Sequence, residues 1–282
     1  MTLRQEARPR RRGLRSLPST LLLWLLALGF IIPVAWFILS SFKPGSELFS
    51  LPLRLFPEDW TISGYTTAWN RFNFAQYFLN TSIVAVVTTV LTVLVSAMTG
   101  YAFAKYKAWW LKFFFICVLA TTMLPTEVIM PSSFAVVRDL GLYNTLAGII
   151  VPSIITATGI FMFRQYFKTI PDELLEAARV DGAGEYRIFF RIVLPLCGPA
   201  LATLGVLTFL ASWNSFLWPL VVASTEEMYT LPVALALFSV GQQETNLGLQ
   251  MAGSLVVVLP VILLFFVMQR WVIQGISTTG IK

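Results

Sequence analysis

Long apolar stretches separated by short polar connections dominate the hydropathy pattern of the chain. Six of these stretches are long enough for a membrane-spanning helix, which needs about 20 predominantly apolar residues. Lys and Arg occur only at their ends, and the one acid inside them is Glu127, as expected where a charge in hydrocarbon costs at least ~2.5 kcal/mol. The predicted spans lie near residues 20–42, 79–104, 113–134, 145–163, 196–223 and 251–270. The pattern therefore predicts an all-α, polytopic membrane protein.

The composition agrees with a membrane protein and removes most classes of enzyme. Hydrophobic residues make up 57% of the chain and charged residues 12%, against about 25% charged residues in soluble domains. The absence of histidine excludes histidine-dependent triads, proton relays and His-ligated zinc. The two cysteines, Cys117 and Cys197, cannot form a CxxC site and fit inert packing positions without a disulfide. We therefore predict no catalytic residue and no metal site.

Basic residues gather on one side of the predicted spans and indicate the orientation of the chain. The opposite side carries only Lys43, Arg54, Arg71 and Arg138 of the 20 basic residues. By the positive-inside rule, this asymmetry predicts that both termini are cytoplasmic. The net charge of +6 is then a topology signal and not a sign of nucleic-acid binding, because the basic residues flank spans and form no separate basic domain.

The first span follows an arginine-rich tail but is too long for the apolar core of a signal peptide, which has 7 to 15 residues. We interpret it as an uncleaved anchor in the lipid bilayer. The predicted organisation is a basic cytoplasmic tail over residues 1–19 and one six-helix transmembrane domain over residues 20–282.

The connection between the fourth and fifth spans is predicted to contain a short helix with both ends specified. Thr169 and Asp172 have the spacing of a capping box, and Pro171 lies in the first turn. Gly182 supplies the stop. The connection is expected to continue with a second helical stretch from about Glu185.

One side of this short helix is predicted to be small and flat. At 100° per residue, Leu174, Ala177, Ala178 and Asp181 fall on the same side. Such a side lets another surface approach closely, which favours a docking element. An ordinary amphipathic linker resting on the membrane surface is the alternative interpretation.

The same connection carries a sequence signature. It consists of a Glu-Ala-Ala triplet, a glycine after three further residues and a Leu-Pro pair before the fifth span, namely Glu176, Ala177, Ala178, Gly182, Leu194 and Pro195. This pattern matches the EAA signature of permease subunits in binding-protein-dependent ABC importers. Trp213-Asn214 with Phe216 and Pro219, and the segment Leu140–Thr145, extend the likeness. The chain thus resembles the carbohydrate-uptake branch, and within it the shorter six-span partner of maltose-type importers.

The resemblance implies a division of labour between this chain and other subunits. In the family, the EAA loop, here residues 164–195, is the coupling element that sits in a cleft of the ATP-binding subunit. The resemblance assigns this coupling role to Glu176, Ala177, Ala178, Asp181, Gly182, Leu194 and Pro195. The sequence contains no phosphate-binding loop and no Gly-Lys pair, so no cofactor is expected on this chain, and ATP and Mg would be used by separate ATPase subunits.

The resemblance also implies the partners and the location. They are a second homologous permease subunit, two ABC ATPase subunits and an extracytoplasmic sugar-binding protein, with no nucleic acid. The expected location is the plasma (inner) membrane of a bacterium or archaeon, crossed several times.

The class of solute is argued from charge. No Lys or Arg lies within the predicted spans, which favours a neutral polar solute such as a sugar or oligosaccharide. Residues 124–128 and 163–167 also resemble permeases for glycerol phosphate, so import of glycerol 3-phosphate or a related polyol phosphate stays open. A secondary carrier is the alternative from another class, but it should show intramembrane ionisable pairs, and only Glu127 qualifies.

Four residues are candidates for the substrate pathway. Glu127 lies about 15 residues into the third predicted span, or roughly 22 Å at 1.5 Å per residue, where its carboxylate could accept sugar hydroxyls. Trp213, Asn214 and Trp218 form the other group, since aromatic faces stack on sugars and an amide both donates and accepts. The alternatives are a solvated acid near the outer mouth for Glu127, and packing or contacts between helices for the other three.

The outer segment from residue 224 to residue 250 carries Glu226, Glu227 and Glu244 but no basic residue. In related permeases this region faces the substrate-binding protein. We therefore predict either a docking surface or a solvated outer loop.

Overall fold

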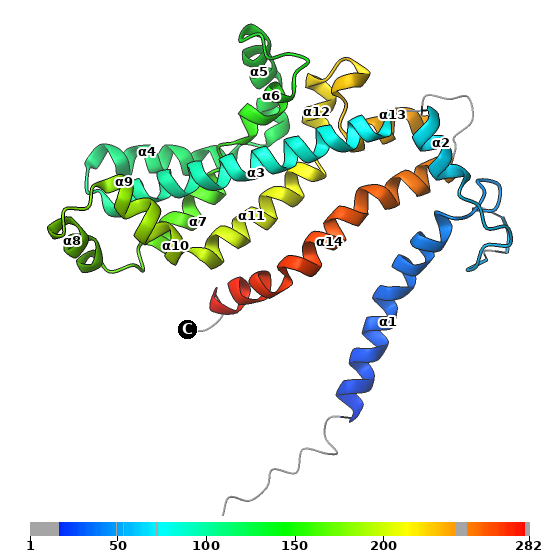
Figure 1. The fold of residues 1–282 in the computed structure, drawn as a ribbon, viewed down its shortest axis with the longest axis horizontal. Helices are drawn as coiled ribbons and strands as arrows, with labels where there is room; N and C mark the ends of the chain where they lie inside the picture. Colours follow the sequence, from blue (N-terminus) through cyan, green and yellow to red (C-terminus); the bar gives the residue numbers. More distant parts are fainter. Residues whose placement is uncertain (1–16, 49, 53, 72, 241–246, 280–282) are drawn as a thin grey trace, which may run out of the picture. The chain divides into compact units, whose positions relative to one another are not determined.

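The computed structural model describes residues 17–279 apart from 49, 53, 72 and 241–246, and every regular element in this part of the chain is a helix (Figure 1). The elements of the first half are α1 (Leu17–Ser40), α2 (Ser63–Arg71), α3 (Phe74–Lys105), α4 (Trp109–Ala120), η1 (Thr121–Met123), α5 (Thr126–Asp139), α6 (Leu146–Ile150) and η2 (Val151–Ser153). Those of the second half are α7 (Ala157–Phe167), α8 (Asp172–Val180), α9 (Glu185–Ile188), η3 (Phe189–Val193), α10 (Leu194–Leu196), α11 (Gly198–Trp213), α12 (Leu217–Val222), η4 (Glu226–Met228), α13 (Leu231–Val240) and α14 (Leu247–Thr279).

The number of helices long and apolar enough to cross a membrane agrees with the predicted fold class. Three single helices qualify within the described residues, namely Thr20–Ser40, Phe74–Lys105 and Leu247–Phe266. Three bent pairs qualify as well, and they are Trp109–Met123 with Thr126–Asp139, Leu146–Ser153 with Ala157–Phe167, and Glu185–Leu196 with Gly198–Trp213. The chain thus has three such helices, or up to six if each bent pair is one span, and the prediction of a polytopic helical membrane protein is confirmed at this level.

Three spans that were predicted as continuous are broken. The fourth, predicted over 145–163, is interrupted at the non-helical residues 154–156 and bends there by 45°. The third predicted span stops before Pro125, and α5 leaves at 111° to the preceding helix. Proline lacks an N–H donor and fixes φ, so a helix is readily interrupted there. The fifth predicted span ends at Trp213, and Leu217–Val222 forms the separate helix α12. The prediction of unbroken helices over 113–134, 145–163 and 196–223 was therefore wrong.

By its contacts the chain divides into two compact units. The larger unit comprises residues 68–245 and 256–282. In it, α3 packs along α7 and α11 (Figure 1), and the core between them contains the fully buried Phe163, Phe167 and Val193. A Cβ on Gly100 would lie 2.7 Å from the Cβ of Phe163, so glycine is what permits the close approach of α3 and α7.

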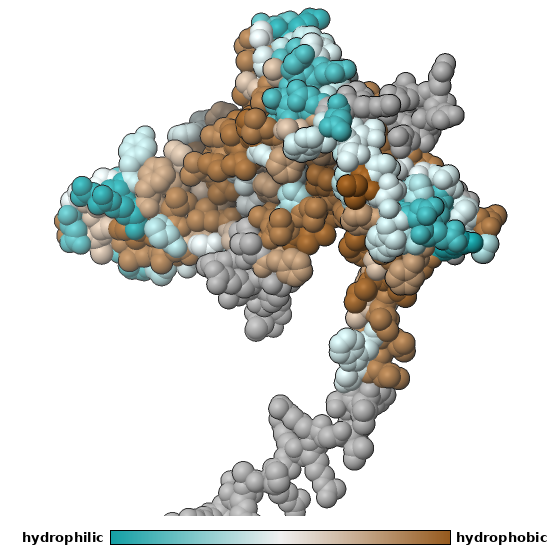
Figure 2. Space-filling view, turned by 45° about the vertical axis from the view of Figure 1, so that its right-hand side comes forward, coloured by the Kyte–Doolittle hydropathy of each residue, from teal (hydrophilic) through white to brown (hydrophobic). Residues whose placement is uncertain are grey.

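The surface of the helices is apolar where lipid would cover it. Exposed aromatic side chains on α4 include Trp109, Phe113 and Phe114. Figure 2 shows hydrophobic residues over the middle of the helices of the larger unit and hydrophilic residues gathered at their ends. This distribution is the one expected of helices in a bilayer.

The smaller unit, residues 1–67 and 246–255, contains a folded connection after α1. The ring of Phe42 lies 6.1 Å from that of Trp60 and 5.5 Å from that of Tyr65. The Tyr65 hydroxyl donates to Ser41 Oγ (2.7 Å), and Lys43, only 3% exposed, donates to the carbonyl of Arg54 (2.5 Å). The connection is thus ordered by aromatic packing and specific hydrogen bonds.

Candidate functional site

The helix at the centre of the EAA loop, α8, begins and ends close to the predicted positions. Asp172 and Glu173 in its first turn favour the positive end of the helix dipole. Gly182 has a φ of +80°, a left-handed conformation that glycine adopts without strain, and it ends the helix as predicted. The predicted capping box was wrong, because the Thr169 hydroxyl donates to the carbonyl of Tyr166 (2.7 Å) and Pro171 occupies the N-cap position.

The buried side of α8 differs from the predicted one. Leu175 and Ala178 are 2% and 9% exposed and face the core of the larger unit, whereas Ala177 is exposed. The prediction that Ala177 and Ala178 lie on one free side was wrong, because the buried side of α8 is centred between Leu175 and Ala178 and its edge falls between the two alanines. In the part of the chain that the structure describes, the other side of α8 is uncovered, and it carries Leu174, Ala177 and Val180 with Glu173 between the last two.

The beginning of α8 is tied to the last residue of α3. Lys105 donates from Nζ to the carbonyl of Ile170 (2.5 Å) and to Oδ1 of Asp172 (2.7 Å). The Lys105 side chain is 5% exposed and that of Asp172 is 59% exposed. The hydrogen bond from Lys105 and its positive charge hold the pKa of Asp172 below its ordinary value. Sequence reasoning counted Lys105 only as a topology charge and missed this contact.

A second contact joins the end of α8 to the residue after α3. Arg179 donates from Nε to Oε1 of Glu185 (2.7 Å), and the Tyr106 hydroxyl donates to Oε2 of the same carboxylate (2.8 Å). Burial and then the hydrogen bond to Glu185 raise the pKa of Tyr106 to about 12. Glu185 therefore bridges α8 and the end of α3, while Tyr106 stays protonated near neutral pH.

A third contact lies at the start of the EAA loop. Arg164 donates from Nε to the carbonyl of Phe103 (3.1 Å), and its guanidinium carbon lies 4.0 Å from the centre of the Phe115 ring. Residues 103–106, which we call the α3 anchor, thus contact the EAA loop at Arg164, at Ile170 with Asp172, and at Glu185. These contacts attach the EAA loop to the end of α3.

The last part of the EAA signature forms a sharp turn. Leu194 begins the short helix α10 and packs against the core, whereas Pro195 is exposed. Beyond it the chain turns by 81° into α11. Cys197 at this turn is buried, in line with the predicted packing position, whereas Cys117 is exposed and does not fit it; both are free thiols.

Glu127 lies at a different kind of position from the one predicted. It sits in the first turn of α5, beyond the break at Pro125, and its side chain is exposed. The Thr126 hydroxyl donates to its carboxylate (3.3 Å). The predicted depth of roughly 22 Å assumed an unbroken third span, so that depth does not apply.

The other three pathway candidates make contacts within the protein. Trp213 is 2% exposed and donates from Nε1 to the carbonyl of Val257 (2.9 Å), and Trp218 donates to the carbonyl of Ile149 (3.2 Å). Asn214 is exposed and donates to the carbonyl of Leu210 at the end of α11 (2.8 Å). Both indole N–H groups are therefore occupied in this conformation, whereas the carboxylate of Glu127 and the amide of Asn214 reach the surface.

The end of the larger unit opposite the EAA loop is held by side-chain amides. Asn144 has a φ of +55° and accepts at Oδ1 from the backbone N–H groups of Ser224 (2.9 Å) and Thr225 (3.2 Å). Asn80 donates from Nδ2 to the carbonyls of Glu227 (2.8 Å) and Tyr229 (2.9 Å). These bonds fix the start of the predicted outer segment. Glu226 and Glu227 are exposed there, and Glu244 lies outside the described residues. They also give the Leu140–Thr145 segment a structural role.

Comparison with known proteins identifies the family. A family model described as "Binding-protein-dependent transport system inner membrane component" matches residues 96–278, which include the whole EAA loop. The chain belongs to this family.

The relatives of the permease are membrane transport components and not enzymes. This chain is 38% identical over 274 residues to the arabinooligosaccharides transport system permease protein AraQ of Halalkalibacterium halodurans. The match covers 94% of this chain and 98% of the relative. The chain is 34% identical over 238 residues to the sn-glycerol-3-phosphate transport system permease protein UgpE of Yersinia pestis, covering 82% and 85%.

A solved structure has the same fold as the permease. It is a chain of a bacterial ABC transporter involved in the import of the acidic polysaccharide alginate. The two chains are 25% identical, with a TM-score of 0.81 over 94% of the permease and 99% of the solved chain.

Proposed function

We propose that the permease is one of two transmembrane subunits of an ATP-driven importer for a neutral sugar or oligosaccharide delivered by an extracytoplasmic binding protein. The observation that carries this proposal is the 38% identity to AraQ along 94% of the chain. The absence of Lys and Arg inside the predicted spans supports a neutral solute.

The proposed topology follows the distribution of basic residues. Residues 1–19 form a cytoplasmic tail, and residues 20–282 form one six-span domain in the inner membrane of a bacterium or archaeon. Both termini and the EAA loop face the cytoplasm, and the segment from residue 224 to residue 250 faces the binding protein. The structure describes residues 17–279 only in part, so the tail up to residue 16 enters this topology by its sequence alone.

The EAA loop is proposed to transmit ATP-driven motion. The uncovered side of α8, with Leu174, Ala177 and Val180 beside the exposed Glu173, offers an apolar and acidic face to an ATPase subunit, which binds ATP and Mg. The exposed Glu176 and Asp181 border this face. Gly182 allows the reversal after α8, the Leu194-Pro195 turn joins the loop to α11, and the α3 anchor joins it to α3. The permease itself holds no cofactor in this scheme.

The pathway candidates divide into two proposed roles. Glu127 and Asn214 have exposed polar groups and are proposed to meet the solute directly. Trp213 and Trp218 are proposed to shape the pathway wall, because their N–H groups bond to Val257 and Ile149.

Import of glycerol 3-phosphate by the same kind of assembly is the second candidate. It is favoured by the 34% identity to UgpE. This function would require the second permease to supply a basic side chain to the pathway, since an anion is held best by charged donors.

The test is purification of the tagged permease from its native membrane in mild detergent, followed by mass spectrometry and reconstitution into proteoliposomes. We expect an ATPase and a second EAA-bearing permease to copurify. The reconstituted assembly should accumulate arabinotriose in a manner that depends on ATP and the binding protein. Accumulation of sn-glycerol 3-phosphate alone would favour the second candidate. A lone chain that transports without ATP would favour a secondary carrier.

A further inference from the structure

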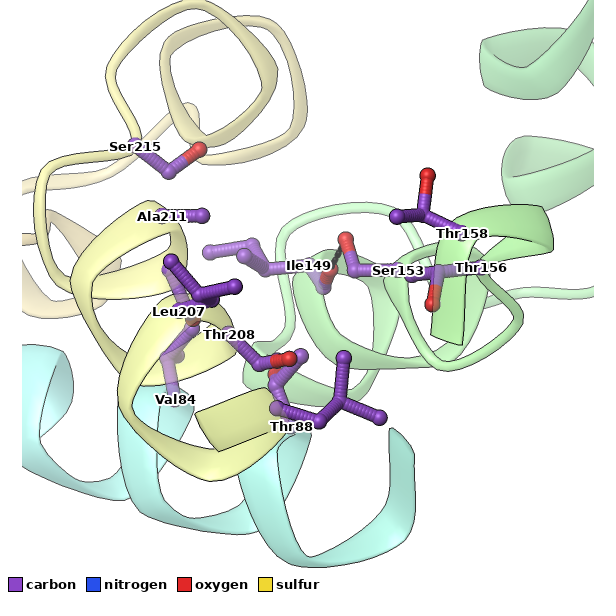
Figure 3. Close-up of a pocket in the computed structure, with 12 residues that line it drawn as sticks. Val84, Thr88, Ile149, Ser153, Thr156, Thr158, Leu207, Thr208, Ala211 and Ser215 are labelled. Carbon is purple, nitrogen blue, oxygen red and sulfur yellow. Dashed lines mark hydrogen bonds between the residues drawn. The ribbon is translucent and has the colours of Figure 1, made fainter. Parts of the chain in front are cut away.

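A cavity rich in hydroxyl groups lies inside the larger unit. Its volume is about 310 Å³, and it is bounded by α3, the α6–α7 pair and α11. In Figure 3 the side chains of α11 face those of the α6–α7 region, and Val84 and Thr88 of α3 lie beside them. Hydroxyl groups come from all three regions, and they include Thr88, Ser153, Thr158, Thr208, Ser212 and Ser215.

The hydroxyl of Thr88 is available to a ligand. Its neighbour Thr89 donates to the carbonyl of Ala85 one turn back (2.6 Å), and Thr203 on α11 does the same to Pro199 (2.8 Å). Thr88 is 2% exposed, yet its Oγ1 has no hydrogen-bond partner in the part of the chain that the structure describes. A buried hydroxyl without a partner is unfavourable unless a ligand or water supplies one. It therefore marks the cavity as a place where a polar molecule is expected.

The backbone beside the cavity points to the same conclusion. The helix pair Leu146–Ser153 and Ala157–Phe167 is bent by 45°, and residues 154–156 between its two parts are not helical. Thr156 caps the second part by accepting from the N–H of Gly159 (3.3 Å). Non-helical backbone at membrane depth is tolerated where it is buried or lines an aqueous cavity, and transporters place solute sites at such interrupted helices.

The lining determines the class of solute. None of the described residues that line the cavity is ionisable, and its other side chains are aliphatic, among them Ile149, Leu204 and Leu207. Hydroxyls both donate and accept, so they match the hydroxyls of a sugar, and the aliphatic groups match its apolar faces. A volume of 310 Å³ is at the small end for small-molecule sites. We propose that this cavity is a solute subsite of the permease that takes one neutral, polyhydroxylated unit, an inference that rests on the proposed function.

The first test compares two pairs of valine variants in the complete importer in proteoliposomes. Thr88→Val and Thr208→Val each remove a hydroxyl from the cavity with little change in shape. Thr89→Val and Thr203→Val remove back-bonded hydroxyls outside it from the same two helices. We expect arabinotriose uptake per ATP hydrolysed to fall roughly threefold to tenfold in each cavity variant. The two control variants should stay within about twofold of the parent importer.

The second test detects the solute directly and does not depend on the stability of the valine variants. Ser212→Cys is made in a Cys117→Ser background, because Cys117 is exposed, and is labelled with a water-soluble thiol reagent. Arabinotriose should slow the labelling, and sn-glycerol 3-phosphate should not. Protection by glycerol phosphate alone would overturn the assignment to neutral solutes.

The outcomes separate the subsite from the function on which it rests. If the parent importer transports arabinotriose, but cavity and control variants behave alike and labelling is not slowed, the subsite is wrong and the function stands. If the parent importer transports neither probe, the proposed function itself fails.

Discussion

The two ends of α3 hold their neighbouring loops by different chemistry. At one end, Lys105 and Tyr106 contact Asp172 and Glu185 of the EAA loop. At the other end, the amide of Asn80 donates to two backbone carbonyls of the outer segment. Contacts to exposed carboxylates depend on pH and salt, whereas amide-to-carbonyl bonds do not titrate. The comparison indicates that the outer segment is held by bonds insensitive to pH and salt, while the EAA loop is held by contacts that conditions and partners can alter.

The largest expected effect comes from placing an arginine on the buried side of α8, to be compared with an arginine on its uncovered side. Ala178→Arg places a charge in the core, because Ala178 is 9% exposed, and it should lower the free energy of unfolding by about 3 to 5 kcal/mol. Thermal unfolding in detergent and membrane abundance measure this loss.

The matched variant is Ala177→Arg on the uncovered side of α8. It should leave abundance and unfolding temperature near those of the parent and reduce ATP-dependent uptake, because bulk and charge obstruct the proposed ATPase contact. Equal loss of abundance in both variants would contradict the assignment of buried and uncovered sides. Normal uptake by an abundant Ala177→Arg permease would contradict the coupling role of this face.

The next largest effect is expected at the Asn80 end of α3. Asn80→Leu leaves the carbonyls of Glu227 and Tyr229 without their donor, which should cost about 1 to 3 kcal/mol. Hydrogen exchange of residues 226–231 should accelerate by a factor that is the same at low and high salt. A strongly salt-dependent factor would remove the distinction between the two ends. Ser82→Ala, which removes an exposed hydroxyl bonded to its own helix, is the control.

A smaller effect is expected at the α3 anchor. Lys105→Met removes the donor to Ile170 and Asp172 while keeping an apolar stem of similar length. Uptake per ATP hydrolysed should fall about twofold to tenfold, because the EAA loop is less firmly attached to α3. Lys112→Met, on the exposed surface of α4, is the control. Restoration of coupling by the pair Lys105→Glu with Asp172→Lys would support the ion pair, and no change in Lys105→Met would exclude it.

The smallest effect is a pH dependence of the same contact. The pKa of Asp172 is lowered from 3.8 by Lys105, so the contact is fully present above pH 3.8 and is lost as the pH falls through the lowered folded-state value. Hydrogen exchange of residues 172–180 in the detergent-solubilised permease should rise over that acidic window. In Asp172→Asn this rise should be absent. An identical profile in both proteins would show that Asp172 does not titrate against Lys105.

The helical class and the position of the short helix in the EAA loop could be predicted from the sequence, because both depend on local patterns. Apolar stretches of span length predict helices directly, and Gly182 stops α8 as its position indicates. The breaks near Pro125, at residues 154–156 and after Trp213 were missed, because hydropathy averaged over a stretch does not register a local interruption. Pro125 and Pro131 were visible in the sequence and could have signalled the first break.

The contacts of the candidate site were harder to predict than its location. Lys105 and Asp172 are separated by 67 positions, so no local pattern relates them. The sequence also does not show that the hydroxyl of Thr88 is unpaired. The adjacent Thr89 is the same residue type on the same helix, yet its hydroxyl bonds to a carbonyl of that helix. Only packing decides which of two adjacent threonines is left without a partner.

Because α3 contacts both loops, it has a thermodynamic consequence for the whole importer. A helix of 32 residues is about 48 Å long at 1.5 Å per residue, and it acts as one body. If a protein bound at the outer segment favours one position of α3, the affinity for a protein bound at the EAA loop changes by some factor. Linkage requires the reverse influence to have the same factor. Measuring the affinity for one of these proteins with and without the other therefore gives the coupling free energy in both directions.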